Sequence, residues 1–183
     1  EIYNEIIERE GKQFLVPMWG FFAIVPEVLR VVWDTLRVLE VDEGHVDRKL
    51  MSAISMLAAE NVGCKRCANY HEETLVQRMD IDREWAEKVK DFENSDLPEK
   101  EKAIYRLAKK VAFGEQLTQK EFEDVRSFGY TDEQIVEIAT IALFESSMAR
   151  HAHVLAQFED GLDWPMEYTP SSTYGEVISG EED

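Results

Sequence analysis

Apolar residues recur every three or four positions along most of the chain, which is the spacing of one face of an α-helix. Residues 26–40, PEVLRVVWDTLRVLE, show this pattern clearly, and Pro26 suits the first turn of a helix. Residues 47–60, DRKLMSAISMLAAE, predict a second helix that Asp47 is able to cap and that ends close to Gly63. The predicted apolar face of this second helix consists of Leu50, Ile54, Leu57 and Ala58.

The same kind of pattern continues toward the C-terminus. We expect helices in the five segments 64–79, 82–92, 97–114, 118–129 and 131–161. Two pairs have the spacing of a capping box: Thr118 with Glu121, and Thr131 with Gln134. Three glycines stand where helices should end: Gly114, Gly129 and Gly161. Because strand patterns are almost absent and the connections are short, the sequence predicts an all-α bundle of about seven or eight helices.

The length of the chain favours one folded domain. A chain of 183 residues, 44% of them hydrophobic, is able to bury one good core. We assign residues 1–164 to a single helical domain. Residues 165–183 contain acidic residues but no Lys or Arg, so we interpret them as an acidic tail.

The charge of the chain excludes some classes of partner. Acidic residues outnumber basic ones by 38 to 20, which gives a formal net charge of -18. Such a protein repels nucleic acids and anionic membrane surfaces. The longest apolar stretch is interrupted by Pro17, Gly20 and Pro26, which is unlike a membrane-spanning helix. With two cysteines as a lone Cys-x-x-Cys pair, we expect a cytoplasmic protein.

The candidate chemistry is concentrated in residues 60–71, ENVGCKRCANYH. On one continuous helix, Glu60, Cys64, Cys67 and His71 would stand at roughly 0°, 40°, 340° and 20°, and thus on one face. If Gly63 interrupts the helix, Cys67 and His71 still lie one turn apart. A thiol reacts as its thiolate, and a helix N-terminus, nearby cations and a base all favour that form. This stretch supplies all three.

Two cysteines at this spacing are able to close a disulfide, so one thiol attacks and the other resolves the oxidised product. The cycle needs no bound cofactor. Two other interpretations remain open. Cys64, Cys67, His71 and Glu60 could together ligate zinc, or the cysteines could simply pack as small hydrophobic side chains. We expect no metal, because no second Cys or His pair lies at zinc-finger spacing.

The remaining histidines carry no strong prediction. We expect His45 to be solvated in an acidic turn. His151 and His153 are two positions apart, so at most one of them could face a pocket. The segments AAENVGCKRCANYH and ALFESSMARHAH share a loose order of acid then histidine, and one such repeat arises easily by chance.

The stretch DRKLMSAISMLAAENVGCKRCANYHEETL, residues 47–75, resembles the core of the alkylhydroperoxidase D-like (AhpD-like), or carboxymuconolactone decarboxylase, family. It is most similar to the peroxidase-related branch, and the resemblance extends over roughly residues 20–163. It implies an all-helical protein that forms trimers, hexamers or related homo-oligomers. It also implies reduction of hydroperoxides by the cysteine pair.

The resemblance also suggests roles for single residues. Cys64, Cys67 and His71 match the Cys-x-x-Cys-x-x-x-His motif of the family, and by this match Cys67 attacks and Cys64 resolves. The family usually carries a glutamate of a proton relay twelve residues before the first cysteine, where this chain has Ser52. We expect Glu60 to take over that function by orienting His71.

These observations predict an enzyme, a thiol-dependent hydroperoxide reductase with a histidine base. Its partners would be a hydroperoxide substrate and a dithiol reductant of the lipoyl or thioredoxin-like kind. A disulfide oxidoreductase that passes electrons to another peroxidase would use the same residues. A non-catalytic helical oligomer is the alternative from a different class.

Overall fold

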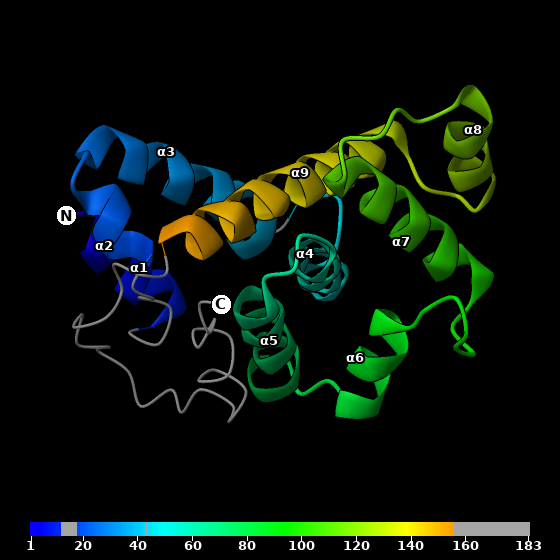
Figure 1. Cartoon of the computed structure of the whole chain (residues 1–183), viewed down its shortest axis with the longest axis horizontal. Coiled ribbons are helices and arrows are strands. Elements are labelled where there is room, and N and C mark those ends of the chain that lie inside the picture. The colour runs from blue at the N-terminus through cyan, green and yellow to red at the C-terminus, as the bar shows by residue number, and fades with distance from the viewer. Residues whose placement is uncertain (12–17, 43, 156–183) are drawn as a thin grey trace, which may run out of the picture. The chain divides into compact units, whose positions relative to one another are not determined.

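The computed structural model describes residues 1–11, 18–42 and 44–155 (Figure 1). Over these ranges it contains nine α-helices and no strand, and eight of the helices have at least seven residues. The all-α prediction is confirmed. Contacts divide the described residues into two compact units: one with residues 1–42 (apart from 12–17) and 152–155, the other with residues 44–151. The prediction of one domain over 1–164 stays a prediction, and the acidic tail lies outside the described residues.

In its described residues, the first unit contains three complete helices and the last residues of a fourth, α9 (Asp132–Leu155). The complete helices are α1 (Ile2–Glu10), α2 (Met18–Ala23) and α3 (Pro26–Leu36), which continues as a π-helical segment, Arg37–Val41. Trp19 and Trp33 pack edge to face with ring centroids 6.2 Å apart, and both indoles are buried. The helix predicted over 26–40 is therefore present, and Trp33 on its apolar face joins α3 to α2.

The second unit is organised around α4 (Arg48–Asn61), which packs against α5, α6 and α7 (Figure 1). Asp47 caps α4 as predicted, since its carboxylate accepts the backbone N–H of Leu50 at 2.9 Å. Residues 51–59 are all buried, not only one face of the helix. A helix that packs against neighbours on several sides has no solvent-exposed face. Small polar residues such as Ser52 and Ser55 are therefore buried along α4.

The other helices of this unit agree with the predicted segments. They are α5 (Lys65–Glu73) with a π-helical continuation (Thr74–Arg78), α6 (Arg83–Lys90), α7 (Glu99–Ala112), α8 (Gln119–Ser127) and α9 (Asp132–Leu155). Gly63, Gly114 and Gly129 have positive φ at helix ends, where a side chain would be strained. Gly161 lies outside the described residues.

The turn before α4 corrects one expectation. His45 is exposed but not merely solvated, because its ring Nδ1 lies 2.6 Å from the Glu137 carboxylate of α9. Glu137 also accepts the backbone N–H groups of His45 and Val46, at 3.0 and 3.1 Å. This hydrogen bond raises the pKa of the His45 ring above its ordinary value. The interaction spans about ninety residues, so local sequence patterns did not reveal it.

In the described ranges, no helix is long and apolar enough to cross a membrane. The predicted cytoplasmic location remains a prediction.

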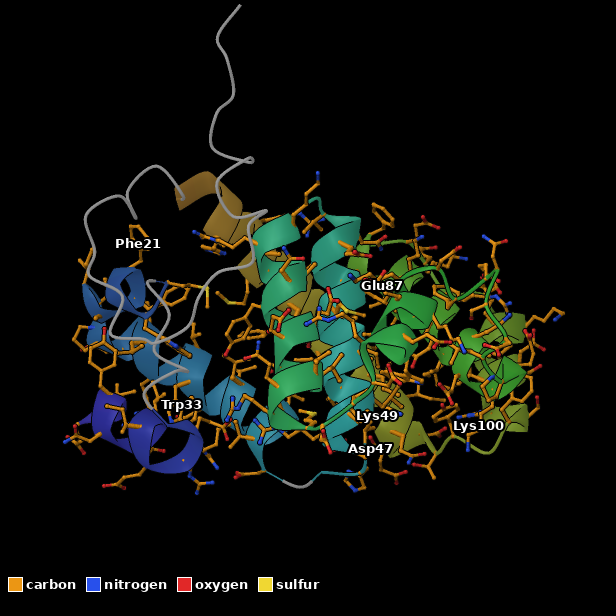
Figure 2. The ribbon with its side chains drawn as sticks, turned by 90° about the horizontal axis from the view of Figure 1, so that it is seen from below. Phe21, Trp33, Asp47, Lys49, Glu87 and Lys100 are labelled. Atoms are coloured by element: carbon orange, nitrogen blue, oxygen red, sulfur yellow. A yellow bond between two sulfur atoms is a disulfide. The ribbon has the colours of Figure 1, made fainter. Side chains whose placement is uncertain are left out.

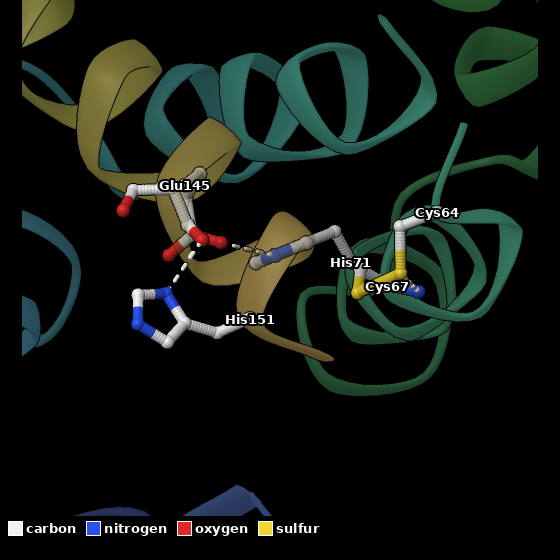
Figure 3. The surroundings of a disulfide bond; sticks show 6 residues. Cys64, Cys67, His71, Glu145 and His151 are labelled. Carbon is white, nitrogen blue, oxygen red and sulfur yellow. Dashed lines mark hydrogen bonds and ion pairs between the residues drawn. A yellow bond between two sulfur atoms is a disulfide. The ribbon is translucent and has the colours of Figure 1, made fainter. Parts of the chain in front are cut away.

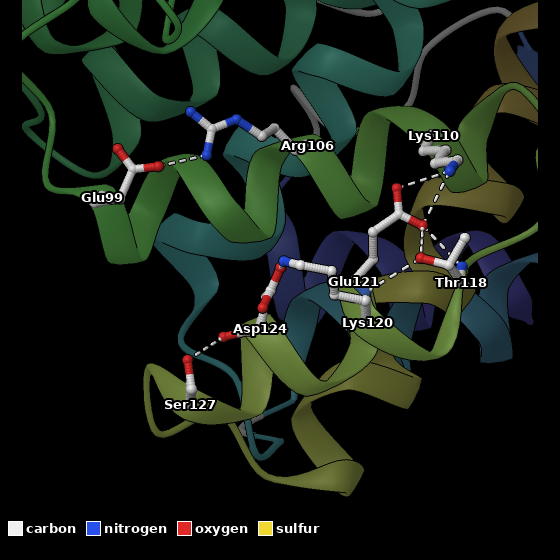
Figure 4. A network of polar contacts seen from close by, with 8 residues as sticks. All are labelled: Glu99, Arg106, Lys110, Thr118, Lys120, Glu121, Asp124 and Ser127. Atoms are coloured by element: carbon white, nitrogen blue, oxygen red, sulfur yellow. Dashed lines mark hydrogen bonds and ion pairs between the residues drawn. The ribbon is translucent and has the colours of Figure 1, made fainter.

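The capping box at the start of α8 is formed as predicted (Figure 4). Thr118 Oγ1 accepts the backbone N–H of Glu121, and the Glu121 carboxylate accepts the backbone N–H of Thr118 at 2.7 Å. Lys110 of α7 donates to the same carboxylate at 2.7 Å. The Lys110 ammonium and the Thr118 groups together lower the pKa of Glu121 to about 2.

We predict that Glu121→Gln removes a pH-dependent part of the stability. Because the folded pKa lies below the ordinary value of 4.5, the carboxylate stabilises the fold above about pH 4.5. This contribution is lost as the pH falls toward 2. Urea unfolding of the native chain and the variant should therefore differ at pH 6 and converge at pH 2 to 3. Glu123→Gln on the same helix is the control, and equal behaviour of both variants would contradict the prediction.

Candidate functional site

A sharp turn between α4 and α5 positions the two cysteines. Gly63 has a φ of 79°, which ends α4 and redirects the chain at Cys64. Cys64 is the N-cap of α5, and its sulfur accepts the backbone N–H of Cys67 at 3.4 Å. The predicted break at Gly63 is therefore present. The Cys64 sulfur lies at the partly positive N-terminus of a helix, where a thiolate is favoured.

Cys64 and Cys67 are joined by a disulfide, with their Cα atoms 5.4 Å apart (Figure 3). This Cα separation lies in the usual range for a disulfide. Cys64 is only 5% exposed, whereas Cys67 is partly exposed. Cys67 is therefore the more accessible residue of the pair.

His71 lies one helical turn after Cys67 and faces inward. It is 6% exposed, and its Nε2 lies 3.2 Å from the Glu145 carboxylate of α9, which is 5% exposed (Figure 3). Glu145 was not predicted as a site residue. Its only signal in the sequence was the loose repeat of acid and histidine in ALFESSMARHAH.

The two other positions considered for the proton relay differ in exposure. Glu60 is at the surface, where neighbouring side chains still remove enough water to raise the pKa of its carboxyl group. Glu87 adds to this increase, and Lys90 opposes it. Ser52 is buried in α4. The proposed role of Glu60 remains a prediction, but the carboxylate that contacts His71 is Glu145.

A second buried acid fixes α5 on α6. Glu72 is 5% exposed and forms ion pairs with Arg83 and Lys90, at 2.8 and 2.5 Å. Burial lowers the pKa of Lys90, but the hydrogen bonds to Glu72 and Glu87 outweigh this and raise it overall. Thus α5 is held by Glu72 toward α6 and by His71 toward α9, which restricts its rotation.

The late histidines do not join the sulfurs in the described contacts. His151 is exposed, and its Nδ1 donates to the backbone carbonyl of Ser147 at 3.0 Å. The side chain of His153 lies outside the described part of the structure. Within that part, no three His, Cys, Asp or Glu side chains are grouped as a metal site would require.

Several solved structures share this fold. A peroxidase-related protein from Silicibacter sp. TM1040 superposes with a TM-score of 0.74 at 18% identity, covering 85% of this chain and 81% of the other. A peroxidase-related protein with an alkylhydroperoxidase AhpD core, from Ralstonia eutropha JMP134, gives 0.72 at 22% identity, with 84% and 80% covered. The debrominase Bmp8, in complex with 2,3,4-tribromopyrrole, gives 0.72 at 18% identity, with 85% and 81% covered.

The chain thus has the AhpD-like fold of peroxidase-related proteins, which confirms the recognised resemblance at the level of the fold. No family model matches the sequence. No curated protein matches it either.

We predict that the two reduced thiols differ in accessibility. After full reduction, a limiting amount of iodoacetamide should label Cys67 before Cys64, because Cys64 is buried and Cys67 is partly exposed. Peptide mass spectrometry of the labelled chain measures the ratio. Faster labelling of Cys64 would show that the thiolate at the helix N-terminus, and not exposure, controls reactivity.

Proposed function

We propose that the protein is a thiol-dependent hydroperoxide reductase. The observation that carries the proposal is the placement of a disulfide-forming cysteine pair one turn before a buried histidine that a carboxylate holds. The shared fold with peroxidase-related proteins supports the same class of reaction. No cofactor is needed, because the two thiols supply both electrons.

In the proposed cycle the Cys67 thiolate attacks the terminal oxygen of a hydroperoxide. The O–O bond breaks, Cys67 becomes a sulfenic acid, and the alkoxide leaves as an alcohol after taking one proton. The Cys64 thiol then attacks the Cys67 sulfur, water leaves, and the disulfide forms. A dithiol partner, of the lipoyl or thioredoxin-like kind, reduces the disulfide and becomes a disulfide itself.

His71 is the proposed base. It takes the thiol proton and returns a proton to the leaving alkoxide. The Glu145 carboxylate, 3.2 Å from the ring, stabilises the protonated imidazole and fixes the orientation of the ring. In this chain we therefore assign to Glu145 the positioning role that a relay glutamate would have, in preference to Glu60.

The chain is also proposed to form a homo-oligomer of the trimer or hexamer kind. In support, α3 and its flanks expose apolar side chains at heptad-like spacing, with Val31 65% exposed and Val38 55% exposed. The members of this exposed stripe are Ile24, Val28, Val31 and Val38.

The direct test is the mass of the chain after one equivalent of an organic hydroperoxide. The reduced native chain should lose two hydrogens as the disulfide forms. Cys64→Ser should retain a sulfenic acid that dimedone traps at Cys67, and Cys67→Ser should keep its thiol.

Intact thiols in all three proteins would overturn the proposed function. If a dithiol protein still exchanged electrons rapidly with the Cys64–Cys67 disulfide, the result would favour a disulfide oxidoreductase. If the native chain had no redox activity, and the double variant Cys64→Ser, Cys67→Ser assembled normally, the results would favour a non-catalytic oligomer.

The role of Glu145 gives a separate prediction. In Glu145→Gln the amide no longer stabilises the charged imidazole, so a higher pH is needed to form the Cys67 thiolate. We expect the pH–rate profile of peroxide consumption to move up by about one unit, equivalent to about 1.4 kcal/mol. Glu145→Asp should recover part of the shift.

Glu60→Gln is the matched control, because it makes the same change at the acid predicted from the sequence. It should leave the profile in place. A shift in Glu60→Gln, with none in Glu145→Gln, would return the relay role to Glu60. Circular dichroism and thermal unfolding of each variant separate these outcomes from loss of the fold.

A further inference from the structure

A pocket lies in the second unit, at the end of α4 away from the cysteines. Its volume is about 430 Å³, which lies within the range of small-molecule sites. The pocket is lined by Lys49 in the first turn of α4, Lys100 in the first turn of α7 and Tyr130 just before α9. Trp85 of α6 also lines it. Figure 2 shows Asp47, Lys49 and Lys100 at this end of the unit.

The two lysines of the pocket contact aromatic rings. Lys49 Nζ lies 3.7 Å from the centroid of the Trp85 ring, and Lys100 Nζ lies 4.9 Å from that of Tyr130. In the described ranges neither ammonium forms an ion pair, although acidic residues outnumber basic ones by 38 to 20. A contact with a ring leaves the ammonium hydrogens able to bind an oxyanion.

Tyr130 supplies an unused donor. The residue is only 8% exposed, yet its hydroxyl group has no hydrogen-bond partner within the described part of the chain. Burial, with the nearby Glu101 and Asp47 carboxylates, raises the pKa of Tyr130 to about 12. The hydroxyl group therefore keeps its proton at neutral pH and is able to donate it to a ligand oxygen.

The acids and the histidine of the pocket have other partners. Asp47 accepts the Leu50 N–H at 2.9 Å, and Glu101 lies 3.5 Å from the buried Tyr105 hydroxyl group. His45 is held by Glu137. Residues of the first turns of α4, α7 and α9 also line the pocket. The backbone dipole of a helix favours a negative group at its N-terminus.

We propose that this pocket binds a small aromatic carboxylate. Its carboxylate would lie between the Lys49 and Lys100 ammoniums and accept the Tyr130 hydroxyl proton in a hydrogen bond. Its ring would pack in the space lined by Trp85. The 14 residues of α4 extend over about 20 Å, so this ligand is separate from the thiols and acts as an effector or as cargo, not as the reduced peroxide.

The test is isothermal titration calorimetry of the full native chain with benzoate, benzamide and inorganic phosphate. Benzoate should bind saturably and more weakly as salt is added, whereas benzamide, its neutral analogue, should not bind. The double variant Lys49→Gln, Lys100→Gln should weaken benzoate binding at least tenfold, and Tyr130→Phe should weaken it several-fold. Lys109→Gln, an exposed lysine of α7 outside the pocket, is the control and should bind normally.

Absence of benzoate binding, or equal binding by the double variant, would overturn the proposal. Phosphate bound as tightly as benzoate would overturn the assignment of an aromatic ligand. All of these variants should consume hydroperoxide at the native rate. Absence of benzoate binding is therefore distinguishable from absence of the thiol chemistry.

Discussion

The contact between His71 and Glu145 is the constraint on which the proposed site depends. Both side chains are almost fully buried, and the two residues, which belong to α5 and α9, are 74 positions apart in the chain. Burying an imidazole and a carboxylate costs desolvation energy, and breaking such a pair by removing one partner typically costs about 3–5 kcal/mol. The pair therefore requires α5 and α9 to keep one relative position, and with it the direction of the histidine beside the thiols.

The rest of the second unit supports this placement. The central helix α4 is buried along residues 51–59 and ends at a glycine whose positive φ turns the chain into α5. That turn makes Cys64 the N-cap, so the first sulfur accepts a backbone N–H, whereas Cys67 is partly exposed. Glu72, the residue after His71 along α5, forms ion pairs with Arg83 and Lys90 of α6. Cys67 and His71 are thus positioned by helix α5, and Cys64 by the turn that precedes it.

Local features of this fold could be predicted from the sequence. The caps at Asp47 and Thr118, the break at Gly63 and the Cys67–His71 face all depend on residues within four positions of one another. Such features follow from helix geometry alone. The contacts of His71 with Glu145 and of His45 with Glu137 could not be predicted in this way. Each joins α9 to a segment far away in the sequence, and nothing local distinguishes Glu145 from the other acidic residues, 38 in all.

The central claim is that two protein thiols supply the electrons that reduce a hydroperoxide. The most direct measurement is a single turnover of the fully reduced chain with one equivalent of cumene hydroperoxide, in which cumyl alcohol and protein disulfide are both quantified. We expect one alcohol and one Cys64–Cys67 disulfide for each hydroperoxide consumed. Alcohol formed without loss of thiols, or formed equally fast by the alkylated chain, would contradict it.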